Sequence, residues 1–126
     1  MTIQSKILAQ QNLTIYSGEG IITHTDILAA LKTFFAGEPT LKVLWDLQQA
    51  SLTQITADQL RLVVQYSARF NHTRAGGKTA LLVSQRLGDY GMGRMIEILG
   101  NMAATWVETA VFRDFDEAVK WLDVTL

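Results

Sequence analysis

Two short runs of almost entirely apolar residues restrict the fold of this chain more than any other feature. They are LKVLWDL at Leu41–Leu47 and TALLVS at Thr79–Ser84, and each has the length of a single strand. A strand that is apolar on both sides has to be covered on both faces, as in the centre of a parallel sheet. The sequence therefore predicts an α/β domain in which these two segments lie side by side as inner strands.

The segments around the inner strands complete the order ββαβαβαβα. A hairpin is expected from Lys6–Gln10 and Leu13–Ser17, with its turn at Gln11 and Asn12, and a last strand at Val107–Phe112. Apolar residues recur at helical spacing in four further segments: 26–35, 57–70, 90–104 and 115–122. Because strands that alternate with helices form right-handed crossovers, we expect one mostly parallel or mixed sheet of about five strands with four helices. No linker or repeat divides the chain, so residues 1–126 form a single domain.

Local signals mark where the helices begin and what they bury. Thr25 is the expected N-cap of the first helix, and Thr56 with Gln59 three residues later matches a capping box. Asp114 and Glu117 are expected to cap the last helix. That helix is predicted to bury Phe115, Ala118, Val119 and Leu122.

Charge and cysteine content exclude several classes of function. The net charge of −1, from 11 basic and 12 acidic residues, gives no excess that would attract nucleic acid. The absence of cysteine excludes disulfides, thiolate catalysis and cysteine metal sites. No apolar stretch is long enough for a signal peptide or a membrane span. We therefore expect a cytoplasmic protein with no stable membrane insertion, no metal and no cofactor.

Four segments together resemble the SpoIIAA-like family of STAS-type domains. They are LWDL at 44–47, TALLVS at 79–84, YGMGRMIE at 90–97 and VFRDFDEAVKWL at 111–122, and the match in segment order extends from about Leu13 to Leu122. The resemblance implies a STAS-like sheet with helices packed against it and a regulatory role through a protein partner. It also implies a phosphorylated serine at a helix start, where this chain has Gln54–Ala57 with Thr56 as the only hydroxyl.

Polar residues are expected at the carboxyl ends of the strands, where open α/β sheets bind their ligands. Asp46, Arg94 and Arg113 are the candidates for polar contacts, with Tyr90 and Met95 lining the wall. The two arginines could bind a carboxylate or phosphate, or they could form internal ion pairs with nearby aspartates. The Asp46 carboxylate could lie at a pocket rim or accept a hydrogen bond from a nearby amide.

Three other features have a functional and a structural interpretation. Thr56 could be phosphorylated at its helix start or could serve only as a cap. The glycines at 88, 91 and 93 could let backbone amides approach a phosphate, or could allow a tight turn and close helix packing. His24 and His72 have no acidic residue at ligand spacing, so they are interpreted as solvated loop residues.

The leading hypothesis is a non-enzymatic regulatory or binding module that acts through a protein partner or a small apolar or anionic ligand. One alternative is a small hydrolase- or transferase-like enzyme that uses Asp46 as a base. Another is a purely structural homo-oligomer. Leu62, Tyr66 and Trp121 flank their helical stripes and could form a homodimer face or simply cover the sheet.

Overall fold

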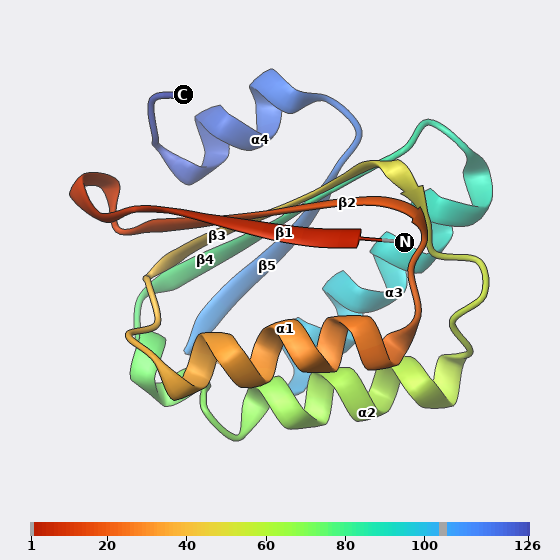
Figure 1. Ribbon diagram of the computed structural model, residues 1–126, viewed down its shortest axis with the longest axis horizontal. Helices are drawn as coiled ribbons and strands as arrows, with labels where there is room; N and C mark the ends of the chain where they lie inside the picture. Colours follow the sequence, from red (N-terminus) through yellow and green to blue (C-terminus); the bar gives the residue numbers. More distant parts are fainter. Residues whose placement is uncertain (1, 104–105) are drawn as a thin grey trace.

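The computed structural model describes residues 2–103 and 106–126 and contains one five-stranded sheet covered by helices (Figure 1). In order across the sheet, the strands are β1 (Thr2–Leu8), β2 (Leu13–Ile21), β3 (Lys42–Ser51), β4 (Gly77–Val83) and β5 (Val107–Phe112). Strand β1 is antiparallel to β2, and the strands from β2 to β5 are parallel to one another. The mixed sheet and the order ββαβαβαβα are confirmed.

In the described residues, three α-helices and two short 3₁₀ turns connect the strands, and a fourth α-helix follows β5. The helices are α1 (His24–Ala36), α2 (Ala57–Ala68), α3 (Leu87–Ala103) and α4 (Phe115–Leu122), and the turns are η1 (Ala9–Gln11) and η2 (Asn71–Arg74). None of the helices in the described part of the chain is long and apolar enough to cross a bilayer.

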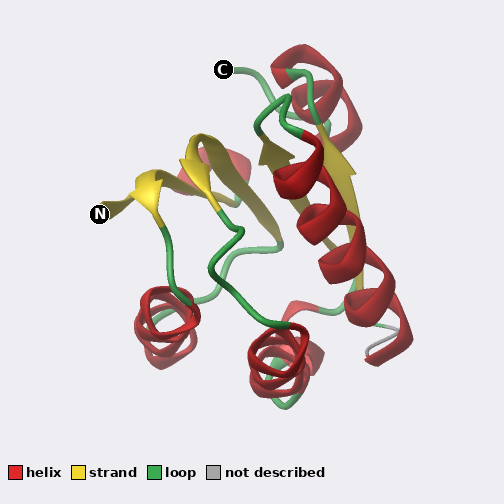
Figure 2. Ribbon diagram, turned by 90° about the vertical axis from the view of Figure 1, so that its right-hand side faces the viewer, coloured by secondary structure: helices red, strands yellow, loops and turns green. Residues whose placement is uncertain are grey.

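The parallel strands follow one another across the sheet in chain order, so the right-handed crossovers place α1, α2 and α3 on the same face. Figure 2 shows α1 and α2 end-on beneath the strands, with α3 running lengthwise beside them. Helix α4 covers the opposite face (Figure 1), where Ala118 and Leu122 pack against Leu13, Leu44 and Leu82. One face of the sheet is therefore covered by α1, α2 and α3, and the other is covered by α4.

The two apolar runs are the inner strands β3 and β4. Leu44 is paired in register with Ala80 and Trp45 with Leu81, and all four side chains are buried. Alternate residues point to opposite faces, so Trp45 joins the larger core under α1–α3 while Leu44 joins the core under α4. This confirms the expectation that both faces of these strands are covered.

The N-cap of α1 is Thr23 and not Thr25. The Thr23 hydroxyl accepts a hydrogen bond from the Asp26 backbone at 3.3 Å, and the Asp26 carboxylate accepts one from the Thr23 backbone at 2.8 Å. In a capping box the acidic residue lies three positions after the N-cap, so Asp26 forms the box with Thr23 and not with Thr25. The predicted capping box of Thr56 and Gln59 at α2 is confirmed.

Other boundaries differ from the predicted ones. Strand β1 begins at Thr2 and α3 begins at Leu87, three residues before Tyr90. The predicted end of this helix at Ala104 lies outside the described residues. Phe115 is 38% exposed, because the buried stripe of the short helix α4 is carried by Ala118 and Leu122.

Candidate functional site

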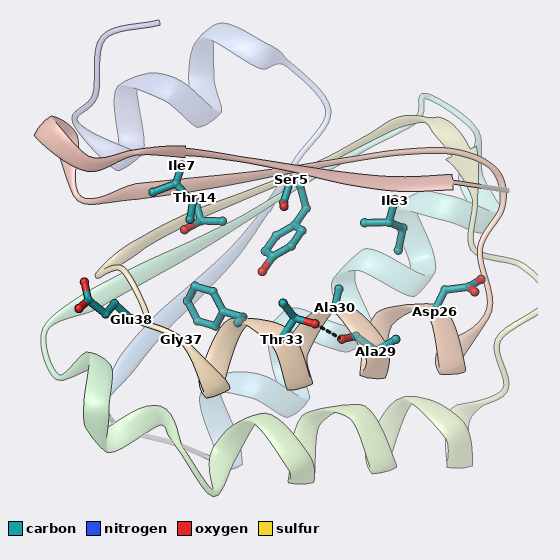
Figure 3. Close-up of a pocket in the computed structure, with 12 residues that line it drawn as sticks. Ile3, Ser5, Ile7, Thr14, Asp26, Ala29, Ala30, Thr33, Gly37 and Glu38 are labelled. Atoms are coloured by element: carbon teal, nitrogen blue, oxygen red, sulfur yellow. Dashed lines mark hydrogen bonds between the residues drawn. The ribbon is translucent and has the colours of Figure 1, made fainter.

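A groove of about 420 Å³ lies between the antiparallel edge of the sheet and helix α1 (Figure 3). One wall consists of alternate residues of β1 and β2, and the other is one side of α1. The groove residues are Ile3, Ser5, Ile7, Thr14, Tyr16, Asp26, Ala29, Ala30, Thr33, Phe34, Gly37 and Glu38. A volume of this size falls within the range of small-molecule sites in proteins.

The groove exists because β1 has no crossover helix of its own. Strand β1 joins β2 through the tight turn η1, whereas α1 connects β2 to β3. On α1, the residues nearest β1 are the small Ala29, Ala30 and Thr33, which leave the space under Ile3 and Ser5 unfilled. Their short side chains are visible along the helix in Figure 3.

Three of the six polar side chains that line the groove have hydrogen-bond partners among the described residues. Thr14 shares a hydrogen bond with Thr40 at 2.8 Å, and the Thr33 hydroxyl donates to the Ala29 carbonyl at 3.3 Å. The Asp26 carboxylate belongs to the capping box of α1. Tyr16 differs, because its hydroxyl has no hydrogen-bond partner in residues 2–103 or 106–126 although the residue is only 5% exposed.

Tyr16 and Phe34 separate the groove from two smaller hollows inside the molecule. A hollow of about 40 Å³ is lined by both of these rings together with Ser67, Arg74 and Thr79. A second hollow of about 90 Å³ continues from there toward α3 and shares Ser67, Arg74 and Thr79 with the first. Two small, mostly apolar hollows with a few polar groups therefore lie behind the groove.

Arg74 is a buried cation at the side of both inner hollows, and its residue is 3% exposed. Its guanidinium donates to the carbonyls of Thr40, Leu41 and Lys78 at 2.8, 3.0 and 3.2 Å, and to the Thr79 hydroxyl at 3.0 Å. The guanidinium also lies 5.5 Å from the centre of the Phe34 ring. All of these partners are uncharged, and the ion pairs among the described residues do not include Arg74.

The chain brings Arg74 to this place through the turn before β4. A Cβ atom at Gly77 would lie 2.4 Å from the Leu41 carbonyl oxygen, so only glycine lets β4 start this close to β3. The neighbouring Gly76 has a φ of +84°, which a residue with a side chain rarely adopts. The expected Gly76–Gly77 turn therefore has a structural purpose, which is to place η2 against the two inner strands.

Burial shifts the proton affinities of both groups in opposite directions. It raises the pKa of Tyr16 to about 12, although the nearby charge of Arg74 lowers it in part. It lowers the pKa of Arg74 to about 10. At neutral pH the phenol is therefore a neutral hydrogen-bond donor and the guanidinium remains charged.

Asp46 lies within β3 and not at its end, because the strand continues to Ser51. Its carboxylate accepts hydrogen bonds from the backbone and the side-chain amide of Gln48, at 3.3 and 3.1 Å. It also lines a shallow hollow of about 130 Å³ with Ser17 and Glu19. Its hydrogen bonds match the interpretation as an acceptor for a nearby amide.

Arg94 lies in the second turn of α3 and not the first, because this helix starts earlier than predicted. It forms an ion pair with Glu97, whose second carboxylate oxygen accepts a hydrogen bond from the Val111 backbone at 2.8 Å. Arg113 has a different partner, since its guanidinium lies 4.2 Å from the centre of the Tyr90 ring. The structure therefore brings Arg113 and Tyr90 together but gives Arg94 a partner of its own.

The hollow beside Arg113 and Tyr90 measures about 400 Å³ and also contains Gln85, Asp114 and Glu117. It is open and lined by charges of both signs. Met95 does not line it and packs against the larger core. Of the five predicted site residues, two meet here.

The other candidates have structural roles or stand apart. Thr56 holds its capping box, and a Cβ atom on Gly93 would lie 2.6 Å from Val111, which is the close helix packing expected of one of the glycines. His24 opens α1 and His72 belongs to η2. Within the described residues, no three His, Asp or Glu side chains gather where they could hold a metal ion.

Sequence reasoning missed the groove for a local and a nonlocal reason. The predicted first strand began at Lys6 and so left out Ile3 and Ser5, although their alternation with Ile7 is a strand signal. The row of small residues on α1 was a second signal. Strand β1 and helix α1 lie opposite each other because of the sheet topology. The residue pattern of either segment alone does not predict that topology.

Comparisons with known proteins support the fold. No protein-family model matches this chain, and no curated protein sequence matches it. Among solved structures, it is similar to an uncharacterized protein of the DUF3478 family with a SpoIIAA-like fold, from Shewanella loihica PV-4. The two share 18% sequence identity with a TM-score of 0.55, over 96% of this chain and 92% of the other. The likeness shows the fold alone, and it confirms that this chain has a SpoIIAA-like fold.

Proposed function

We propose that this chain is a non-enzymatic binding module that takes a small ligand with an apolar body into the groove between β1, β2 and α1. The observation that carries the proposal is the groove itself, whose walls combine aliphatic and aromatic side chains with a few hydroxyl groups. Small-molecule sites have this composition, in which apolar surface supplies affinity and a few polar groups fix the orientation.

The chemistry of the lining favours binding over catalysis. A hydroxyl nucleophile needs an adjacent base. The two carboxylates, Asp26 and Glu38, lie at opposite ends of the groove (Figure 3), and Asp26 is engaged with Thr23. Between them, the Thr14 and Thr33 hydroxyls are bonded to Thr40 and to the Ala29 carbonyl, and neither bonds to a carboxylate.

A fluorescent probe tests this proposal. The neutral apolar dye N-phenyl-1-naphthylamine should bind the purified protein with a rise in fluorescence. Ala29 is exposed on α1 and lines the groove, so Ala29→Trp should fill the groove and remove most of the signal without disturbing the core.

Ala36→Trp is the matched control, because Ala36 is exposed on the same helix but does not line the groove. It should bind the dye as the wild type does. Equal dye binding by Ala29→Trp and the wild type would contradict the groove as the binding site. The same holds if the wild type does not raise the fluorescence of the dye. In either case a protein partner becomes the better hypothesis.

A further inference from the structure

The inner wall of the groove contains a hydroxyl that is free to donate, on the largely buried side chain of Tyr16. Tyr16 pairs in register with Trp45 on the next strand and stacks on it, with the two ring centres 4.3 Å apart. Its ring is therefore fixed, and its hydroxyl has no partner among the described residues. Every fully buried side-chain polar atom of the described residues has a partner, so this unpaired hydroxyl keeps some accessible surface, where it can donate to a ligand.

Behind this hydroxyl lies a positive charge without an acidic partner. A guanidinium has five N–H groups, and Arg74 uses four of them on three carbonyls and one hydroxyl. The fifth, on Nη1, has no partner in the described part of the chain. Buried charges in proteins are normally paired, and the partners present here supply no negative charge.

The protonation states of the two groups favour an anion at the same place. The raised pKa of Tyr16 keeps its proton available as a donor, and Arg74 remains charged at neutral pH. Both side chains line the hollow directly behind the groove. One hydroxyl and one N–H suit a carboxylate, whereas a phosphate would need more donors.

We propose that the ligand is an amphipathic monocarboxylate, with its carboxylate at the Tyr16 hydroxyl in the field of Arg74 and its apolar body along β1 and α1. This inference rests on the proposed function of the groove. The body would lie against Ile3, Ala30 and Phe34. Among the described residues, the charged side chains of the lining are Asp26 and Glu38, which lie at the two ends and so repel the carboxylate toward the middle (Figure 3).

Competition against the bound dye tests the charge requirement with two probes of equal length. Octanoate and octan-1-ol have the same chain but differ in the head group. Because hydrogen bonds to charged groups are the stronger ones, octanoate should displace the dye at a concentration about 10- to 100-fold lower than octan-1-ol.

Tyr16→Phe tests the donor with little risk to the fold, since the hydroxyl that it removes has no partner in the described residues. The variant should bind octanoate about tenfold more weakly and octan-1-ol as tightly as before. Tyr66→Phe is the control, because Tyr66 is partly buried on α2 and does not line the groove. It should leave both affinities unchanged.

The outcomes separate the two proposals. If the dye and octan-1-ol bind but octanoate has no advantage, or if Tyr16→Phe weakens both probes equally, the groove remains a site and the carboxylate inference is wrong. If the wild type binds neither the dye nor either octyl compound, both proposals are wrong.

Discussion

Asp89 is a buried carboxylate in the first turn of α3, and its residue is 1% exposed. One oxygen accepts from the Leu52 backbone at 2.8 Å, and the other accepts from the Ser84 hydroxyl and Arg86 at 2.6 and 2.9 Å. Burial alone would raise the pKa of this carboxyl, but these hydrogen bonds and the charge of Arg86 lower it below its ordinary value. Asp89 therefore connects the loop after β3 to the end of β4.

We predict that Asp89→Asn lowers the free energy of unfolding by about 2 kcal/mol at neutral pH, because the amide directs N–H groups toward existing donors. A lowered pKa stabilises the folded state above the unfolded value of about 4, and this stabilisation is lost as the pH falls through the folded value. The variant should therefore lose less stability than the wild type on acidification.

Urea denaturation across the acidic range measures this effect. Asp58→Asn is the control, because the Asp58 side chain is 94% exposed and should change stability little. Equal stability of Asp89→Asn and the wild type at neutral pH would contradict the account of this network.

At the scale of elements, α3 is fitted closely to β5. Two of its side chains cover the free edge of that strand: Asn101 exchanges hydrogen bonds with the Thr109 backbone, both at 2.9 Å, and Glu97 accepts from the Val111 backbone. An uncovered edge invites pairing with another chain. Close approach of the helix is needed for these contacts, and Gly93 permits it.

We predict opposite effects for two glycine substitutions in α3. A Cβ atom at Gly93 would lie 2.6 Å from a Val111 methyl and 3.2 Å from Val83, so Gly93→Ala should destabilise the fold by about 1–3 kcal/mol. Gly91 has no atom within 4 Å of its Cβ position, so Gly91→Ala should stabilise the helix by about 0.5–1 kcal/mol. Thermal unfolding of both variants measures the difference, and a Gly93→Ala variant as stable as Gly91→Ala would contradict this packing.

The elements that sequence reasoning predicted well are those with a local signal. The inner strands and the Thr56 capping box are visible within a few consecutive residues. The start of α3 was wrong because Gly88 indicated a loop, whereas the structure uses Asp89 beside it as a buried anchor. The lone charge of Arg74 could not be predicted, since its hydrogen-bond partners come from two separate segments, at 40–41 and 78–79.

At the scale of the whole molecule, the strand order explains where a ligand fits. The expected site at the carboxyl ends depends on a reversal of strand order, which opens a crevice in doubly wound sheets. Here the strands follow chain order from β1 to β5 without a reversal. The groove lies instead at the antiparallel edge of the sheet, between β1, β2 and α1.

This arrangement also separates the groove from the predicted polar residues. Asp46 faces the α4 side of the sheet, and the pair of Tyr90 and Arg113 lies near the start of α4. The two regions offer different chemistry, since the groove is mostly apolar and the hollow at Arg113 is open and charged. A binding measurement with residue resolution therefore distinguishes them.

Backbone amide shifts in a two-dimensional NMR spectrum, recorded while octanoate is added to the labelled protein, test the groove as a binding site most directly. We predict that the largest changes fall on residues 3–7 of β1 and 29–34 of α1. Shift changes centred on Tyr90 and Arg113, or no shift changes on addition of octanoate, would contradict the groove as the binding site.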